Sequence, residues 1–185
     1  LIDSKSKVPK AAKTYFRTYL AALSRFEVIR ILGRGAHSDV FHVRSLDNGT
    51  EHALAVLKDK VHKVFSAEEK NGLSQAFKMS PCRNVVALEG LFVADTSLEK
   101  NIRMIAHGRV ISGKIVGTIM QYVSGTELFD VVADRLMPFE RSAQIGKDLS
   151  AGLVDIHFQD AAHHDVKLEN VMLDADYRAK LVDLE

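Results

Sequence analysis

The sequence contains one cysteine, Cys82, among its 185 residues. A single cysteine cannot form a disulfide within the chain, so no internal disulfide holds the fold together. Such a composition fits a protein of the reducing cytoplasm, and it fits a cysteine-poor secreted effector equally well. The compartment therefore stays open.

Long apolar runs and an excess of one charge are also missing. No stretch approaches the roughly 18 to 20 apolar residues that a helix needs to span a bilayer. The 25 Lys and Arg residues are interspersed with 24 Asp and Glu residues and leave a net charge of +1, which argues against nucleic acid as a partner. With 46% hydrophobic and 26% charged residues, the chain can bury a real core in one or two globular lobes.

Residues 1–25 have the pattern of an amphipathic helix. Apolar residues recur there every three or four positions, which is the spacing of one helix face. They are Val8, Ala11, Ala12, Tyr15, Phe16, Tyr19, Leu20 and Leu23. Basic residues occupy other positions, so a helix on a membrane surface is the alternative, but we expect the helix to pack against the domain that follows.

Residues 26–120 are predicted to form a β-rich lobe. The runs FEVIRILGRG, DVFHVRSL and HALAVLK predict three antiparallel strands, and Asn48-Gly49 is a strong hairpin signal between the last two. Two more strands are predicted in VVALEGLFVA and KIVGTIMQYV, separated by a segment, 95–113, long enough to be an insertion with structure of its own. Helices are predicted over residues 66–79 and 141–159, the second from the spacing of its Ile and Leu residues.

Two glycines, Gly33 and Gly35, lie in GRGAHSDV between the first two strands, with Val40 returning on the second. Without a Cβ atom, glycine lets backbone N–H groups approach phosphate oxygens. Ser38 stands where a third glycine would complete such a pattern. Two glycines in a hairpin are more often a simple turn, so this motif alone indicates little.

The segment HHDVKLENVML, residues 163–173, is more specific, because it places Asp165, Lys167 and Asn170 in a loop after a long helix. Here the sequence resembles the protein kinase family. The resemblance implies that Asp165 accepts the proton of the substrate hydroxyl, that Lys167 steadies the transferring phosphoryl group, and that Asn170 holds Mg²⁺. His164 replaces the arginine of the family pattern, so control through a phosphorylated activation loop is not expected. The alternative, a metal site at the paired histidines, lacks the usual partner ligands.

Two other segments match the same family. IMQYVSGTELF resembles the hinge between kinase lobes, and KLVDLE resembles the strand that carries the D-F-G motif. The nucleotide-contacting residues implied by the whole resemblance are Gly33, Gly35, Val40, Ala53, Ala55, Met120, Gln121, Val123, Glu127 and Met172. Asp183 would be the second Mg²⁺ ligand beside Asn170. Leu184 and Glu185 replace the Phe and Gly of the motif, and Glu185 adds a charge where the family keeps a flexible residue.

The resemblance runs from Phe26 to Glu185. It implies a two-lobed α+β protein kinase-like fold with a five-stranded antiparallel small lobe over 26–120 and the hinge with the first part of a helical lobe over 121–185. That lobe is incomplete, so we read the chain as truncated and expect Leu181 and Val182 to lack much of their burial.

Family members carry a lysine on the third strand, and two counts place that position at Ala55. In the family the lysine lies about fifteen residues after the valine that follows the glycine motif, which is Val40 here. It also lies about six residues after the glycine of the next hairpin, which is Gly49 here. Strand alternation agrees, because Ala53 and Ala55 share one face while Lys58 points to the other. The alternative is that Lys58 or Arg34 supplies the missing positive charge. The glutamate partner of that lysine would be Glu68 or Glu69.

We therefore expect a Ser/Thr kinase-like domain that binds ATP and Mg²⁺ with impaired catalysis and acts as a scaffold or regulator of a protein partner. The alternatives are an active kinase carrying a lysine-to-alanine change, and an interaction module without nucleotide binding. The sequence also resembles divergent rhoptry-type kinases in three features: the incomplete glycine pattern of GRGAHSDV, the missing arginine at His164, and the insertion over 95–113.

Overall fold

The computed structural model describes residues 25–58, 82–94, 102–105, 114–134 and 137–183. The chain divides into two compact units, one of residues 1–66 and 89–122 and the other of residues 67–88 and 123–185. The helices predicted over 1–25 and 66–79 lie outside the described residues, as do Glu68, Glu69, Leu184 and Glu185. The division of the chain at residues 25 and 120 stays a prediction.

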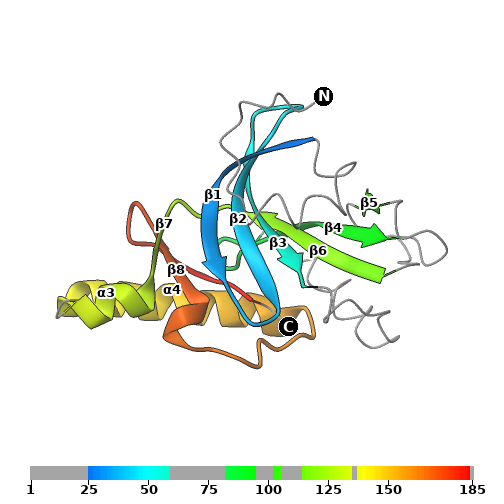
Figure 1. Cartoon of the computed structure of the whole chain (residues 1–185). Coiled ribbons are helices and arrows are strands. Elements are labelled where there is room, and N and C mark those ends of the chain that lie inside the picture. Colours follow the sequence, from blue (N-terminus) through cyan, green and yellow to red (C-terminus); the bar gives the residue numbers. More distant parts are fainter. Residues whose placement is uncertain (1–24, 59–81, 95–101, 106–113, 135–136, 184–185) are drawn as a thin grey trace. The chain divides into compact units, whose positions relative to one another are not determined.

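The first unit is built on one sheet with the strand order β1-β2-β3-β6-β4-β5 (Figure 1). Its strands are β1 (Phe26–Arg34), β2 (Ser38–Ser45), β3 (Glu51–Leu57), β4 (Leu88–Ala94), β5 (Ile102–Ile105) and β6 (Lys114–Gln121). The five expected strands are all present, and β5 adds a short sixth strand from the segment that we expected to be a structured insertion. One boundary was wrong: β4 begins at Leu88, because Val85 pairs with Leu181 of the second unit.

The hairpin between β2 and β3 forms where Asn48-Gly49 predicted it. Gly49 adopts a φ of 74°, a left-handed conformation that glycine reaches without strain. The Asn48 side-chain oxygen accepts the Thr50 backbone N–H at 3.1 Å, and the Ser45 N–H donates to the Thr50 carbonyl at 2.8 Å. These bonds fix the turn, and the turn fixes the register of β2 against β3.

The hydrophobic core of the first unit lies on one face of this sheet. Successive side chains of a strand point to opposite faces, so every second residue of β2 and β3 enters the core. The buried cluster consists of Phe41, Val43, Leu54, Val56, Phe92, Val116 and Ile119. Full burial of each such side chain contributes about 1.5–3 kcal/mol. The side chains on the opposite face of the same strands therefore do not enter this core.

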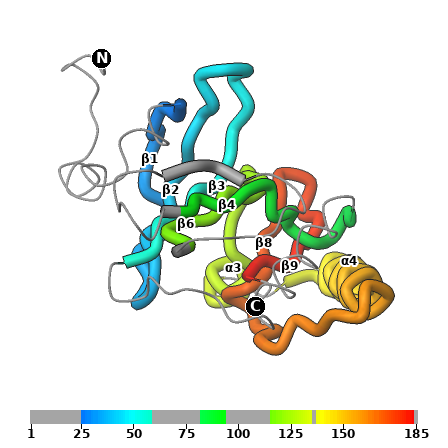
Figure 2. Tube along the Cα trace, turned by 90° about the vertical axis from the view of Figure 1, so that its right-hand side faces the viewer, coloured from blue at the N-terminus to red at the C-terminus, as the bar shows by residue number. Residues whose placement is uncertain are grey.

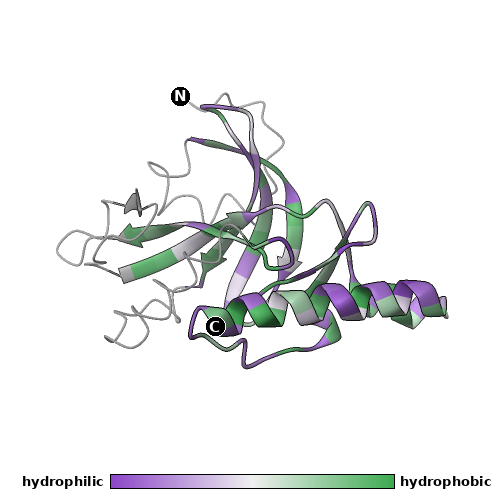
Figure 3. Cartoon of the chain, turned by 180° about the vertical axis from the view of Figure 1, so that it is seen from behind, coloured by the Kyte–Doolittle hydropathy of each residue, from purple (hydrophilic) through white to green (hydrophobic). Residues whose placement is uncertain are grey.

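The second unit contains helices and a small sheet (Figure 2). Its elements are α3 (Leu128–Asp134), α4 (Phe139–Phe158), the short 3-10 helix η2 (Leu168–Asn170), and the antiparallel strands β7 (Gly125–Glu127), β8 (Val171–Asp174) and β9 (Ala179–Leu181). The long helix α4 confirms the pattern predicted over 141–159 and begins two residues earlier. Figure 3 shows its hydrophobic and hydrophilic stripes. No described helix is long and apolar enough to cross a membrane.

The core of the second unit gathers under one side of α4. It consists of Val85, Leu128, Ile145, Ile156, Val171, Leu173, Ala179 and Leu181. The expected exposure of Leu181 was wrong, since only 1% of the residue is exposed. The reason is the segment before β4: the Leu181 N–H donates to Asn84 at 2.9 Å and the Val86 N–H donates to Leu181 at 2.8 Å, so residues 84–86 cover β9. Val182 is half-buried.

Candidate nucleotide and catalytic site

The sheet of the first unit brings together four of the predicted nucleotide-binding residues. In the antiparallel register Val40 lies opposite Ala55, and Ala53 lies opposite Met120. Directly opposed residues of neighbouring strands point to the same side. Val40, Ala53, Ala55 and Met120 therefore share the face opposite to the core, which we call the open face. Gln121 lies opposite His52 at the end of β6, and Val123 belongs to the second unit.

Ala55 occupies the centre of the open face. Its other cross-strand neighbour is Thr118 on β6, and only 8% of the residue is exposed. Phe41, Leu54 and Val56, which flank it in the sheet, lie on the core side. The alternation on which the prediction rested is thus present in the structure, and the side chain at the expected lysine position of the open face is a methyl group.

Lys58 lies beyond the end of β3 and has partners of its own. Its ammonium group donates to the Gly35 carbonyl at 2.5 Å and lies 3.4 Å from a carboxylate oxygen of Asp39. Asp39 lies opposite Val56, so its side chain is on the core side of the sheet. These contacts do not favour Lys58 as the replacement for the missing charge. Arg34, the other candidate, is exposed on the turn.

The two predicted glycines lie at the end of β1 and in the turn that follows it. Gly33 lies opposite Val40, and the Gly35 N–H donates to the Ser38 carbonyl at 2.8 Å. A Cβ atom at Gly35 would lie 3.3 Å from that carbonyl oxygen, whereas one at Gly33 would meet nothing within 4 Å. The compact turn therefore favours glycine at 35 and leaves open space beside 33.

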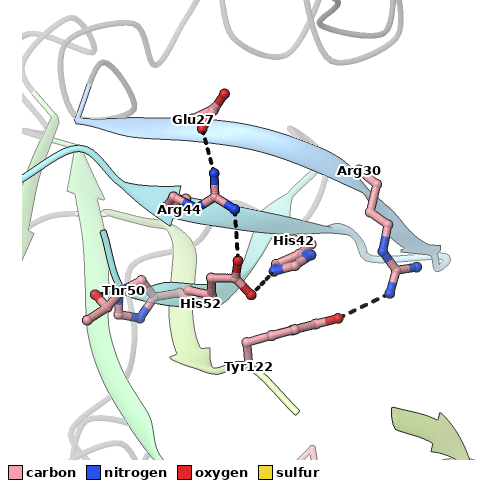
Figure 4. A network of polar contacts seen from close by, with 8 residues as sticks. Glu27, Arg30, His42, Arg44, Thr50, His52 and Tyr122 are labelled. Carbon is pink, nitrogen blue, oxygen red and sulfur yellow. Dashed lines mark hydrogen bonds and ion pairs between the residues drawn. The ribbon is translucent and has the colours of Figure 1, made fainter. Parts of the chain in front are cut away.

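A polar network that we did not predict lies on the same open face (Figure 4). His42 lies opposite Ala53, is 6% exposed, and stacks on the Tyr122 ring with 3.7 Å between ring centroids. Its Nε2 lies 3.0 Å from Glu51, and Arg30 donates to the Tyr122 hydroxyl at 3.2 Å. Since His42 comes two residues after Val40, strand alternation alone could have placed it on this face.

In the second unit, Asp165, Lys167 and Asn170 form one hydrogen-bonded group. Lys167 donates to the Asp165 carboxylate at 2.5 Å, and the Asn170 amide nitrogen donates to the Asp165 carbonyl at 2.9 Å and to its carboxylate at 3.0 Å. The hydrogen bond from Lys167 is the largest cause of the lowered pKa of Asp165, and the same bond raises the pKa of Lys167. Asp165 is therefore a carboxylate at neutral pH, which is the form that can accept a proton.

Two bonds connect residues 163–170 to the segment that ends in Asp183. The buried His163 bonds the Val182 carbonyl through Nε2 at 2.9 Å, and the Val182 N–H donates to the Asn170 carbonyl at 3.0 Å. Asp183 follows directly, exposed and with a φ of 62°. Its negative charge is among the causes of the raised pKa of Lys167, after the bond from Asp165. The structure thus brings Asp183 near the predicted catalytic residues.

The oxygen atoms of this group suit a hard cation. The Asn170 amide nitrogen faces Asp165, which leaves its Oδ1 as an available acceptor, and Asp183 contributes a carboxylate. Mg²⁺ commonly takes one or two protein oxygens together with phosphate oxygens and water. Among the described residues, no group of three or more His, Cys, Asp and Glu side chains is arranged to hold a metal.

Glu127 and Met172 lie opposite each other on β7 and β8. Partial loss of hydration of its carboxyl group is the main cause of the raised pKa of Glu127, and the negative charges of Asp130 and Glu169 add to it. Glu127 is exposed, so its carboxylate is accessible as an acceptor. Its predicted contact with a ribose stays a prediction.

Helix α4 holds the hairpin that follows the catalytic residues. Asp148 is 3% exposed and accepts hydrogen bonds from the Arg178 side chain at 2.7 Å and from the Ala179 N–H at 3.0 Å. Gln144, one turn earlier on α4, donates to the same carboxylate at 2.9 Å. Because Ala179 begins β9, this buried carboxylate fixes the strand that leads to Asp183.

Comparison with known proteins identifies the family of the chain. The sequence model of the protein kinase domain matches residues 26–185. The chain is 30% identical over 162 residues to the serine/threonine-protein kinase pkn2 of Myxococcus xanthus, with 86% of the chain and 18% of that protein covered. It is 26% identical over 164 residues to the human RAC-beta serine/threonine-protein kinase and 29% identical over 167 residues to the rabbit protein kinase C zeta type. These matches cover 87% of the chain and 30% and 25% of the two relatives. The chain spans less than a third of the length of each of these relatives. Because the protein kinase domain model matches residues 26–185, the chain belongs to the protein kinase family.

Proposed function

We propose that this chain is a Ser/Thr-kinase-type domain that binds ATP with Mg²⁺, transfers phosphate poorly, and regulates or scaffolds a protein partner in response to nucleotide. One observation carries the proposal: the side chain opposite Val40 on the open face is the methyl group of Ala55. Val40, Ala53 and Met120 share that face. The apolar part of a nucleotide site is thus kept, and the charge expected beside it is missing.

The missing charge affects transfer more than binding. Phosphoryl transfer relies on positioning and on stabilising the charge that develops on phosphate oxygens. A methyl group provides neither a positive charge nor a hydrogen-bond donor. Removing one such stabilising group typically costs about 10²- to 10³-fold in rate. Adenine and Mg²⁺ contacts do not depend on that group, so binding can persist when transfer is slow.

The other groups needed for phosphoryl transfer would come from residues 165–170 and from Asp183. Asp165 would accept the proton of a substrate hydroxyl, and Lys167, held against it at 2.5 Å, would place a positive charge beside the transferring group. Asn170 and Asp183 would hold Mg²⁺, which neutralises phosphate charge when it is bound. The presence of these four residues supports the second candidate, an active kinase type that carries a lysine-to-alanine change. A module without nucleotide binding is the third.

The deciding experiment compares the parent protein with Ala55→Lys and with Ala55→Met, which fills the same space without a charge. Thermal unfolding of the parent should shift upward with Mg²⁺ and ATP in a saturable way, by about 2.7 kcal/mol in unfolding free energy at a hundredfold excess over Kd. Ala55→Lys should raise phosphate transfer to a Ser/Thr peptide by about 10² or more. Ala55→Met should not.

The outcomes separate the three candidates. No thermal shift at millimolar ATP would contradict nucleotide binding and favour the interaction module. Strong activity of Ala55→Lys alone would support a kinase type silenced at this residue. Equal activity of the parent and Ala55→Lys would contradict impaired catalysis.

A further inference from the structure

Lys58 contacts the segment of residues 33–38, which joins the end of β1 to the start of β2 and which we call the glycine turn. Its backbone N–H donates to the His37 carbonyl at 2.9 Å, and its ammonium group donates to the Gly35 carbonyl at 2.5 Å. The same ammonium lies 3.4 Å from Asp39, the second residue of β2. One lysine therefore contacts the glycine turn at two residues and β2 at a third, 19 to 23 residues away along the chain.

The lysine reaches the turn from the core side of the sheet. Residues 54, 56 and 58 alternate onto that side, and Asp39 lies opposite Val56. The Asp39 side chain is 8% exposed, and its Oδ1 has no hydrogen bond among the described residues. A buried carboxylate oxygen that accepts no hydrogen bond is stabilised by a nearby counter-charge. Lys58 is that counter-charge, so Asp39 in turn holds the ammonium in place.

The bond to Gly35 sets the direction of a peptide plane. In a trans peptide the C=O of one residue and the N–H of the next point in opposite directions, and no described peptide bond is cis. Because the Gly35 carbonyl faces Lys58, the Ala36 N–H must point away from Lys58. It therefore points away from the side on which Lys58 and Asp39 lie.

We propose that Lys58 is a positioning residue for phosphate: with Asp39 as its anchor, it turns the Gly35 carbonyl toward the core side and thereby presents the Ala36 N–H to a nucleotide phosphate. This inference rests on the proposed nucleotide binding and deepens it. It also assigns the lysine of HALAVLK a role that needs no direct contact between its charge and the phosphate. The ligand chemistry is a nucleoside diphosphate or triphosphate.

The test compares ADP with adenosine, since the two differ only in the phosphates. Lys58→Met should weaken ADP binding about tenfold, the cost of a lost hydrogen bond to a charged group, and leave adenosine binding within about twofold. Lys58→Arg should restore most of the ADP affinity. Lys147→Met, which removes an exposed lysine of α4, is the matched control.

Asp39→Asn distinguishes positioning from direct contact. If Lys58 acts through the turn, losing its anchor should weaken ADP binding in the same way as Lys58→Met. If Lys58 instead reaches the phosphate itself, freeing it from Asp39 should strengthen ADP binding, and that result would overturn the proposal.

Amide hydrogen exchange of residues 33–38 without nucleotide supplies an independent readout. Lys58→Met should accelerate exchange there about tenfold or more, and Lys147→Met should not. Unchanged exchange in a protein that still binds ADP would overturn the role of Lys58 alone. A parent protein that binds neither ADP nor adenosine would overturn the proposed function itself, and the phosphate role with it.

Discussion

Asp165 and Lys167 each change the ionisation of the other, which makes this pair sensitive to pH at both extremes. The hydrogen bond between them lowers the pKa of Asp165 from 3.8 and raises the pKa of Lys167 from 10.5. The contribution of Asp165 to stability is present above pH 3.8 and is lost as pH falls through its lower folded-state pKa. That of Lys167 is present below pH 10.5 and is lost as pH rises through its higher folded-state pKa. Both side chains are largely accessible to water, so the effect on global stability is small.

Lys167→Met should therefore return the pKa of Asp165 toward its ordinary value, because the largest cause of the lowering is removed. The measurement is an NMR titration of the Asp165 side-chain carboxyl carbon in the parent and the variant. Lys147→Met serves as the control for a general change in charge. An unchanged Asp165 titration in Lys167→Met would show that the ion pair does not form in solution.

At the scale of elements, α4 shows how two glycines of one helix differ. A Cβ atom at Gly146 would meet nothing within 4 Å, whereas one at Gly152 would lie 2.8 Å from the Asn84 carbonyl oxygen and 3.1 Å from Leu181. Gly152 is thus where the helix approaches the segment that covers β9. Gly146 has no such reason to be glycine.

Gly146→Ala should raise the free energy of unfolding by about 0.5–1 kcal/mol, because alanine loses less backbone entropy in a helix. Gly152→Ala should lower it by about 1–3 kcal/mol, since the clash outweighs that gain. Urea denaturation of the pair measures both. A stabilised Gly152→Ala would mean that α4 and residues 84–86 are not in contact.

Many of the helices and strands are predictable from the sequence, and the contacts that are not predictable have physical causes. The β2–β3 hairpin follows from Asn48-Gly49, and α4 follows from its apolar spacing, because both signals are local. The pairing of Val85 with Leu181 joins residues far apart in the sequence, and nothing local indicates it. The contact of Lys58 with Gly35 likewise depends on the shape of a turn 23 residues away. His42 was within reach of the alternation rule and was overlooked.

At the scale of the whole molecule, each unit has a hydrophobic core of its own. Leu54 is buried in the cluster of the first unit, and Ile156 is buried in that of the second. The described residues of the two clusters do not overlap. A substitution that leaves a cavity in one core should therefore destabilise the unit that contains that core before the other unit.

Leu54→Ala and Ile156→Ala should each lower stability by about 2–5 kcal/mol. Amide exchange should rise in β1–β3 for the first variant and in α4 and β8 for the second. Leu46→Ala, at a leucine that is 62% exposed, is the control and should change stability by less than about 0.5 kcal/mol. Equal loss of protection in both units from either variant would show one cooperative unit instead of two.

The stack of His42 on Tyr122 has an optical consequence. The chain has no tryptophan and four tyrosines, so its ultraviolet emission comes from tyrosine alone. Both tyrosines of the described residues have ring partners, Tyr122 under an imidazole and Tyr177 under the guanidinium of Arg141 at 4.0 Å. Removing the imidazole by His42→Leu changes the surroundings of one of these two rings only. The difference in emission between the unlabelled parent protein and His42→Leu can therefore report whether β2 and the end of β6 stay in contact while nucleotide is added.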